Sequence, residues 1–219
     1  MVLLLLTALA GAPTPAAGQD SVTIARLRYG GGGDWYVSPS AIPNLLAEIR
    51  ARTGIPVAAR EAQVAPLDPA LPDHPFLYMS GHGQVTFTAA EAAALRQHLL
   101  GGGFLLVNDS YGLDESFREA VAAVFPDRPL AEVPRDHPVF HLFYDFPDGP
   151  PKIHEHDGNP PRALGIFHEG RLVVLYLHES DIGDGWEDPD VHDDPPEVRE
   201  QAIRMGVNIF LYALSAPAT

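Results

Sequence analysis

The stretch FLYMSGHGQVTFTAAEAAALRQHLLGGGFLLV, residues 76–107, contains a complete strand–helix–strand unit and decides the fold class. Its first five residues form a short apolar run, and Thr88 and Glu91 have the spacing of a capping box in front of an amphipathic helix. Gly101–Gly103 ends that helix, and a second apolar run follows at 104–107. Two buried strands joined by a helix predict a parallel βαβ unit.

The alternation of strands and helices continues on both sides of this unit. Residues 126–161 break it with prolines, histidines and aromatic residues, and we expect them to form an ordered insertion over one end of the sheet. The pattern predicts an α/β fold with a doubly wound, mostly parallel sheet and an antiparallel hairpin at its edge. The other predicted elements are strands at 21–29 and 55–59, helices at 39–53 and 114–124, a hairpin of strands at 163–167 and 171–178, and a last helix from 194.

Length and composition predict one domain behind a signal peptide. A chain of 219 residues with 46% hydrophobic residues suffices for a single core, and no linker divides it. Residues 2–10 are apolar but too few to span a bilayer, and small residues follow them, as in a secretory signal peptide. We therefore expect residues 1–18 to be removed, residues 19–219 to form the domain, and the mature protein to be periplasmic or extracellular without a membrane span.

Charge and cysteine content narrow the function classes. The formal net charge of −15 disfavours nucleic acids and anionic membrane surfaces, because both require a basic face on the protein. The absence of cysteine excludes thiol nucleophiles, thiolate metal ligands and disulfides. The expected partner is a small polar ligand, neutral or cationic, or another protein of the cell envelope.

Polar residues and glycines follow four predicted strands, at the edge where doubly wound sheets bind ligands. The glycine run 30–33 lets the backbone approach a ligand closely; because neither phosphate-loop spacing is complete, a merely permissive connection is the alternative. We expect the four strand exits to converge on one cleft. The candidate ligand-binding residues are Gly31, Gly32, Asp34, Trp35, His82, Asn108, Asp109, Asp181 and Trp186.

Three residues of these exits are candidates for catalysis. His82 is exposed by a glycine on each side, and Asp109 and Ser110 follow the strand at 104–107. A serine hydrolase built on Ser110 with His82 and Asp181 lacks the G-x-S-x-G pattern, so capping of the next turn is the alternative role of Ser110.

Ten histidines in a chain without cysteine suggest a site for zinc, manganese or calcium. His154 and His156 lie two apart, so on an extended segment their side chains face the same way. Because the helical H-E-x-x-H pattern is absent, histidines in a solvated loop are the alternative. The candidate ligands are His154, His156, Glu179, Asp181 and Asp184, to which His192 can be added.

Four separated motifs resemble a bacterial family, the domain of unknown function 4159. They lie at residues 29–36, 75–83, 179–188 and 205–208, and the resemblance extends from about residue 22 to residue 214. That family is similar in fold to the class I glutamine amidotransferase-like superfamily, which implies a flavodoxin-like sheet, and it implies no established activity. Glutamine hydrolysis in that superfamily needs a cysteine nucleophile, so its chemistry is excluded here.

Three functions remain open from the sequence. The first is an exported amidotransferase-like domain that binds a small polar or carbohydrate-like ligand. The second is a metal-dependent or carboxylate-based hydrolase that uses His82, Asp109 and Asp181. The third is an interaction module of a cell-envelope complex. Histidines and carboxylates clustered within ligand distance would favour the second.

Overall fold

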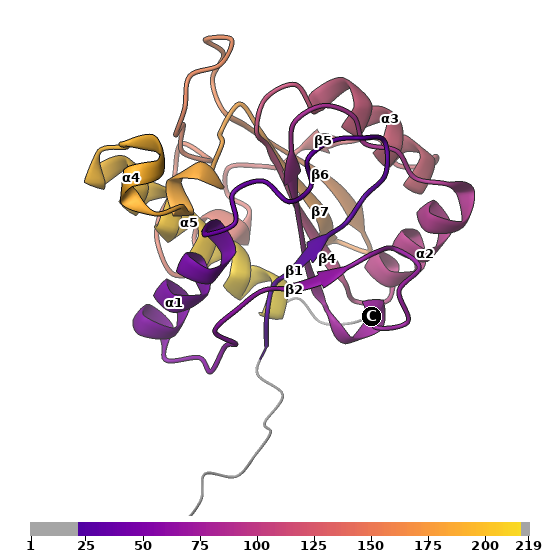
Figure 1. Ribbon diagram of the computed structural model, residues 1–219, viewed down its shortest axis with the longest axis horizontal. Coiled ribbons are helices and arrows are strands. Elements are labelled where there is room, and N and C mark those ends of the chain that lie inside the picture. Colours follow the sequence, from indigo (N-terminus) through magenta and orange to yellow (C-terminus); the bar gives the residue numbers. More distant parts are fainter. Residues whose placement is uncertain (1–21, 216–219) are drawn as a thin grey trace, which may run out of the picture.

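A seven-stranded sheet in the order β2-β1-β3-β4-β7-β6-β5 forms the centre of the computed structural model, which describes residues 22–215 (Figure 1). Strands β1, β2, β3, β4 and β7 are mutually parallel, β6 is antiparallel to β7, and β5 is antiparallel to β6. The predicted mostly parallel sheet is therefore confirmed, whereas the predicted hairpin, β6–β7, lies one strand inside the edge that β5 forms. The strands are β1 (Ala25–Leu27), β2 (Ala62–Val64), β3 (Phe76–Gly81), β4 (Phe104–Asp109), β5 (Ala131–Glu132), β6 (Arg162–His168) and β7 (Arg171–His178).

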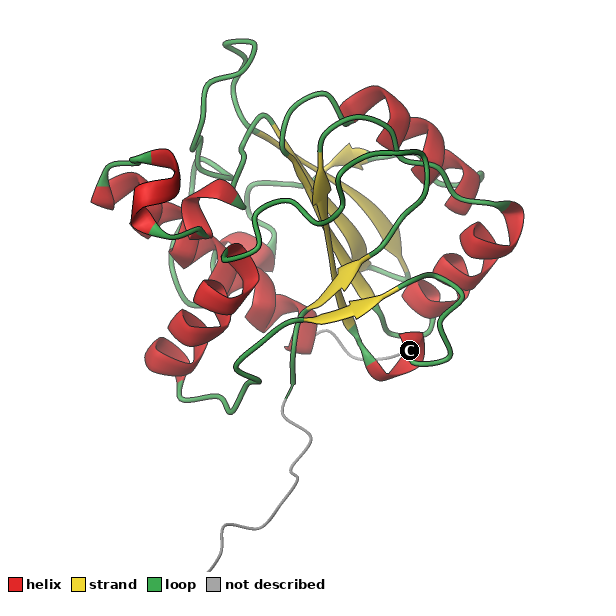
Figure 2. Ribbon diagram, viewed as in Figure 1, coloured by secondary structure: helices red, strands yellow, loops and turns green. Residues whose placement is uncertain are grey.

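Helices cover both faces of this sheet. Helices α1 (Ala41–Thr53) and α5 (Pro196–Ser215) lie on one face, and α2 (Ala89–Leu100) and α3 (Asp114–Val124) lie on the other (Figures 1 and 2). The capping box of α2 is present, with Thr88 Oγ1 accepting from the Glu91 amide. Short helical turns complete the described chain: η1 (Leu71–Asp73), η2 (Pro138–Phe140), η3 (Asp184–Trp186) and α4 (Pro189–His192).

The sheet separates two apolar cores because successive side chains of a strand point to opposite faces. In β4, Phe104 and Leu106 belong to the core under α1 and α5, whereas Leu105 and Val107 belong to the core under α2 and α3. A strand that is buried on both faces reads as a continuous apolar run, which is why the sequence pattern located it. No helix within residues 22–215 is long and apolar enough to cross a bilayer. The predicted signal peptide, residues 1–18, lies outside the described residues.

The second strand is where the sequence-based prediction was wrong. We expected it at 55–59, but there only Val57 forms an isolated bridge, and β2 begins at Ala62. The interruption has an electrostatic reason. Arg26 of β1 is 1% exposed, and the excursion before β2 places the Glu61 carboxylate 2.9 Å from its Nε. A buried guanidinium needs such a partner, so the ion pair determines where the strand starts.

The insertion at 126–161 is ordered, as predicted, but it also supplies a strand and part of the core. Its β5 forms the edge of the sheet, and Val139, Phe140 and Phe146 join the core under α1 and α5. The buried Asn208 of α5 anchors it, because its Nδ2 donates to the Tyr144 carbonyl at 2.7 Å.

Candidate functional site

Strained backbone gathers in the loops that leave the carboxyl end of the sheet. Six non-glycine residues between 22 and 215 have a positive φ, and four of them lie in these loops: Ser38, Tyr111, Glu179 and Asp181. Each residue held in such a conformation costs about 1–3 kcal/mol, and strain of this kind clusters at active sites and ligand clamps. The loops at this edge of the sheet are therefore the first candidates for a functional site.

Asn108, at the end of β4, is the centre of a buried polar network that joins three strand exits. Its Nδ2 donates to Ser110 Oγ at 3.1 Å and to Asp181 Oδ1 at 3.2 Å, and it lies 3.3 Å from Ser80 Oγ. Its Oδ1 accepts from the Gly183 amide at 3.2 Å. The Asn108 side-chain amide therefore links two other predicted site residues, Ser110 and Asp181. It also provides hydrogen-bond partners for polar groups that would otherwise be unpaired in the interior.

Beside Asp181, three side chains present ligand atoms to one point. His154, Asp184 and His192 each offer one atom, and these atoms all lie within 4.8 Å of one another. His154 Nδ1 is 3.1 Å from Asp184 Oδ2, and His192 Nε2 is 3.5 Å from the same oxygen. Neighbouring ligands around a tetrahedral zinc ion lie about 3.3 Å apart, given metal–ligand distances of about 2.0–2.1 Å. The two distances from Asp184 Oδ2 thus match the spacing of neighbouring ligands around one metal ion.

Further carboxylates surround these three residues. Asp194 Oδ1 is 3.0 Å from His154 Nε2, the ring nitrogen that faces away from Asp184. This is the carboxylate–histidine arrangement that orients metal-ligating imidazoles in known metal sites. Glu187 Oε2 is 2.9 Å from His192 Nε2, on the same side as Asp184, and its other oxygen accepts from the Ser40 hydroxyl at 3.1 Å.

Local structure explains how segments distant in sequence meet here. The Ile153 amide donates to the Ser180 carbonyl at 2.8 Å, which fastens the insertion, and with it His154, to the loop after β7. Gly183 lies so close to β4 that an added Cβ would be 3.2 Å from Asn108 Nδ2, so glycine lets η3 and its Asp184 sit directly on the sheet. The Ser38 hydroxyl then donates to Asp184 Oδ1 at 3.3 Å.

The ionisation of the cluster reflects closely spaced carboxylates in a partly buried place. Burial and the neighbouring Asp181 charge raise the pKa of Asp184 to about 6. Hydrogen bonding to Asp181, which outweighs the effect of burial, and the charges of Asp194 and Asp184 raise the pKa of His154 to about 9. Burial would raise the pKa of Asp181, but bonds from His154 and Asn108 outweigh it and lower that pKa. The site therefore attracts positive charge, supplied by protons or by a metal cation.

The other predicted metal ligands surround the cluster without joining it. His156 Nε2 is 3.1 Å from Asp181 Oδ2, and its ring stacks on Tyr111 with centroids 5.0 Å apart. Glu179 instead pairs with Lys152, whose Nζ lies 2.8 Å from Glu179 Oε2. The charge of Glu179 is thus neutralised by its own cation.

Asp109 belongs to a second polar group, on the α3 side of the sheet. The Tyr176 hydroxyl lies 3.1 Å from Asp109 Oδ2 and 2.9 Å from Asp114 Oδ1, and His178 Nε2 lies 3.8 Å from both oxygens. Burial raises the pKa of Asp109, against the effect of its hydrogen bonds from Leu113 and Tyr176. Asn108 and Asp109 are successive residues of β4, so their side chains lie on opposite faces of the sheet.

The remaining candidate site residues lie outside the His154 cluster and the Asn108 network. Trp186 is 1% exposed, and its Nε1 donates to the Ala202 carbonyl at 2.8 Å, so its ring packs in the core. Trp35 is partly buried against the core under α2 and α3. Gly31 packs against the 84–86 backbone, where an added Cβ would be 2.8 Å from the Gln84 carbonyl oxygen, and Gly32 is exposed. Asp34 and His82 contact each other, with His82 Nδ1 2.9 Å from Asp34 Oδ2.

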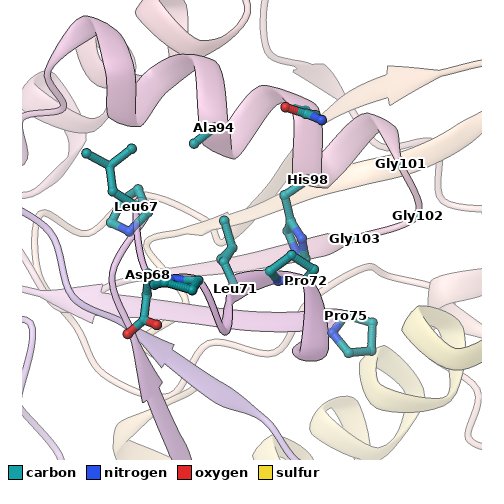
Figure 3. Close-up of a pocket in the computed structure, with 13 residues that line it drawn as sticks. Leu67, Asp68, Leu71, Pro72, Pro75, Ala94, His98, Gly101, Gly102 and Gly103 are labelled. Atoms are coloured by element: carbon teal, nitrogen blue, oxygen red, sulfur yellow. The ribbon is translucent and has the colours of Figure 1, made fainter.

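An apolar cavity of about 590 Å³ lies at the other end of the sheet. Prolines of the 66–75 segment, which precedes β3, form one wall, and the end of α2 with Gly101–Gly103, which precede β4, forms the other (Figure 3). None of the residues predicted from the sequence to form a site lines this cavity.

The sequence of the chain matches one known protein family over most of its length. Residues 23–214 match the model of a family described as Domain of unknown function (DUF4159). The chain belongs to this family. The resemblance noted from four sequence motifs is thereby confirmed for DUF4159. No curated protein matches the chain.

Sequence reasoning missed several contributors to the site. Asp194 was expected only at the start of the last helix, and Ser38 stands directly before the first predicted helix, yet they contact His154 and Asp184. Lys152, the partner of Glu179, had no motif around it. The concentration of acidic residues from 181 to 200 was the available signal, because carboxylates that fold inward need cations or histidines beside them.

Proposed function

We propose that this DUF4159 domain binds a divalent transition-metal ion through His154, Asp184 and His192 and acts as a metal-dependent hydrolase on a small polar substrate. The observation that carries the proposal is the convergence of two imidazole nitrogens and one carboxylate oxygen within 4.8 Å of one another. Of the three functions left open by the sequence, this clustering favours the second, but with His154, Asp184 and His192 in place of His82, Asp109 and Asp181.

The donor set supports a transition metal over calcium. Imidazole suits zinc, copper, iron and nickel, whereas calcium takes six to eight oxygen ligands. The Asp194 carboxylate behind His154 supports the same choice, because metal-ligating histidines almost always donate their second nitrogen to such a group. Of the three metals considered from the sequence, zinc fits best.

Three protein ligands favour a catalytic over a purely structural ion. Structural zinc sites use four protein ligands, whereas catalytic sites use three and keep one position for water or substrate. A metal held by these three residues would lower the pKa of a bound water and so supply a nucleophile near neutral pH. The protein contributes the neighbouring carboxylates and the Asn108 network, which hold Asp181 in place. The charge of −15 favours a neutral or cationic substrate.

Metal analysis of protein purified without a histidine tag tests the proposal. We expect about one transition-metal ion per chain, and its loss in Asp184→Asn and His192→Gln. His168→Gln, at the end of β6 where it pairs with Arg171 of β7, is the matched control and should keep the ion. Metal-free wild-type protein that takes up no zinc, manganese, iron or nickel in dialysis would overturn the metal site. Metal-loaded protein without hydrolysis of ester, phosphoester or amide probes would overturn only the hydrolase assignment.

The finer fold class is also a proposal. Numbered along the chain, the parallel strands β1, β2, β3, β4 and β7 have the spatial order 2-1-3-4-5, which is the order of flavodoxin-like sheets. This order supports a class I glutamine amidotransferase-like fold, in which ligands bind where the crossover direction reverses, between β1 and β3. An experimental structure with a different strand order would contradict it.

A further inference from the structure

The glycine run that follows β1 packs against a second chain segment. The Thr86 amide donates to the Gly30 carbonyl at 2.9 Å and the Gly33 amide to the Gln84 carbonyl at 3.0 Å, so 30–34 runs antiparallel to 82–86. An added Cβ at Gly33 would lie 2.7 Å from the His82 carbonyl oxygen, closer than real Cβ atoms approach. The glycines at 30–33 are therefore explained by close contact between two backbone segments. A phosphate-binding loop is not needed to explain them.

This packing brings Asp34 directly onto His82. One Asp34 oxygen accepts from the His82 backbone amide, and the other lies 2.9 Å from His82 Nδ1. Both carboxylate oxygens thus act on one residue, which fixes the histidine backbone and the direction of its ring. Hydrogen bonds from His82 outweigh the partial burial of Asp34 and lower its pKa, so the carboxylate is ionised and Nδ1 carries the proton.

The second ring nitrogen of His82 is left available. Within residues 22–215 no hydrogen bond reaches Nε2, and the side chain is 51% exposed. Asp34, by contrast, is two-thirds shielded. A shielded carboxylate that holds an accessible imidazole in one tautomer is the geometry of a base whose free nitrogen points at a substrate.

We infer that His82 is a general base that acts through Nε2, with Asp34 as its positioning residue. The inference rests on these two residues alone and does not require a metal at His154, Asp184 and His192. Its substrate is a small molecule that loses a proton from a hydroxyl group or from an attacking water. As the O–H bond breaks, the proton passes to Nε2, and the resulting imidazolium keeps its Nδ1–H donated to Asp34. The deprotonated oxygen attacks an electrophilic carbon or phosphorus of the substrate, the bond from that atom to the departing group breaks, and Nε2 returns the proton to the departing group.

The proton-abstraction probe 5-nitrobenzisoxazole tests this without knowledge of the natural substrate. A base removes its ring C–H proton, the N–O bond breaks, and a coloured cyanophenolate forms, with no other reactant. We expect His82→Gln and Asp34→Asn each to lower the rate constant by roughly an order of magnitude, below the 10²–10⁴ of an evolved base because the probe is not the natural substrate. His168→Gln is the control and should react as the wild type does.

A spectroscopic measurement separates a positioned base from a structural contact. Long-range ¹H–¹⁵N spectra of neutral His82 should show the proton on Nδ1 in the wild type and a mixture of tautomers in Asp34→Asn. Equal probe rates in wild type and His82→Gln, or a proton on Nε2 in the wild type, would overturn the inference. Metal content measured on the same His82→Gln protein should be unchanged, so failure of this inference and failure of the metal site are distinguishable.

Discussion

At the scale of single residues, two members of the His154 cluster have different roles: His154 is a candidate metal ligand, and Asp194 orients its ring. Asp194→Asn keeps the shape beside His154 Nε2 but removes the charge, and we expect about 10–100-fold weaker metal binding, the usual effect of losing such a partner. Competition with a chromogenic chelator measures the affinity. Asp190→Asn, on the exposed surface of α4, removes the same charge nearby and should leave the affinity within about twofold. An equal loss of metal affinity in both variants would mean that only the total negative charge near the site matters, and not the contact of Asp194 with His154.

Asp184 makes a prediction about pH. Its pKa is raised to about 6 in the metal-free protein, above the unfolded value near 3.8, so the folded state binds the extra proton. By linkage, its contribution to stability is present below about pH 4 and is lost as the pH rises through 6. Asp184→Asn should remove this dependence and raise the melting temperature of metal-free protein at pH 7, although it abolishes metal binding. Thermal melts at pH 4 to 8 with chelator check this, and a melting temperature below that of wild type at pH 7 would contradict it.

The same reasoning gives His154 the same sign in a higher pH window. Its pKa is raised to about 9, so its stabilising contribution is complete below about pH 6.5 and is lost as the pH rises through 9. In His154→Gln, metal-free protein should lose less stability between pH 7 and pH 9.5 than the wild type does. Urea denaturation at both pH values, with chelator present, measures the difference. Equal losses in the two proteins would contradict the predicted pKa direction.

At the scale of elements, helix α5 depends on a glycine at its centre. An added Cβ at Gly206 would lie 2.6 Å from Leu45 Cδ1 of α1 and 2.9 Å from the Trp186 ring, which its bond to the Ala202 carbonyl keeps in place. Alanine gains about 1 kcal/mol of helix propensity over glycine, but overpacking costs about 1–3 kcal/mol. Because the indole cannot move aside, we expect Gly206→Ala to destabilise the protein, by about 1–2 kcal/mol in chemical denaturation. A stabilised variant would show that the helix shifts to make room.

Elements with strong local signals were predictable, and elements set by distant partners were not. The α2 capping box and the continuous apolar run of β4 are properties of neighbouring residues, and both lie where the pattern placed them. The start of β2 depends instead on the pairing of Glu61 with Arg26, residues 35 positions apart in the chain. The same limit applies to the site. Histidines and carboxylates were recognised as candidates, but only the fold decides that Asp184 meets His154 while Glu179 meets Lys152.

At the scale of the whole molecule, the insertion at 126–161 packs into the same core as helices α1 and α5. Phe140 and Phe146 are buried in the core under α1 and α5, so cleavage within the insertion requires that this core open first. Limited proteolysis should therefore leave one protected core and no pair of stable fragments divided within 126–161. Mass spectrometry of the digestion products measures this. Two persistent fragments with separate melting transitions would contradict the prediction.

The three candidate metal ligands come from different parts of the chain: the insertion, the turn η3 and the short helix α4, none of whose four residues is buried. An ion that joined His154 to Asp184 would tie two loops together in a protein that has no disulfide to do so. By chain-entropy reasoning, a cross-link that closes the 154–184 segment contributes roughly 3–4 kcal/mol of stability. Metal supply would then determine how long the protein survives heat and proteases, in addition to any chemistry that the ion performs.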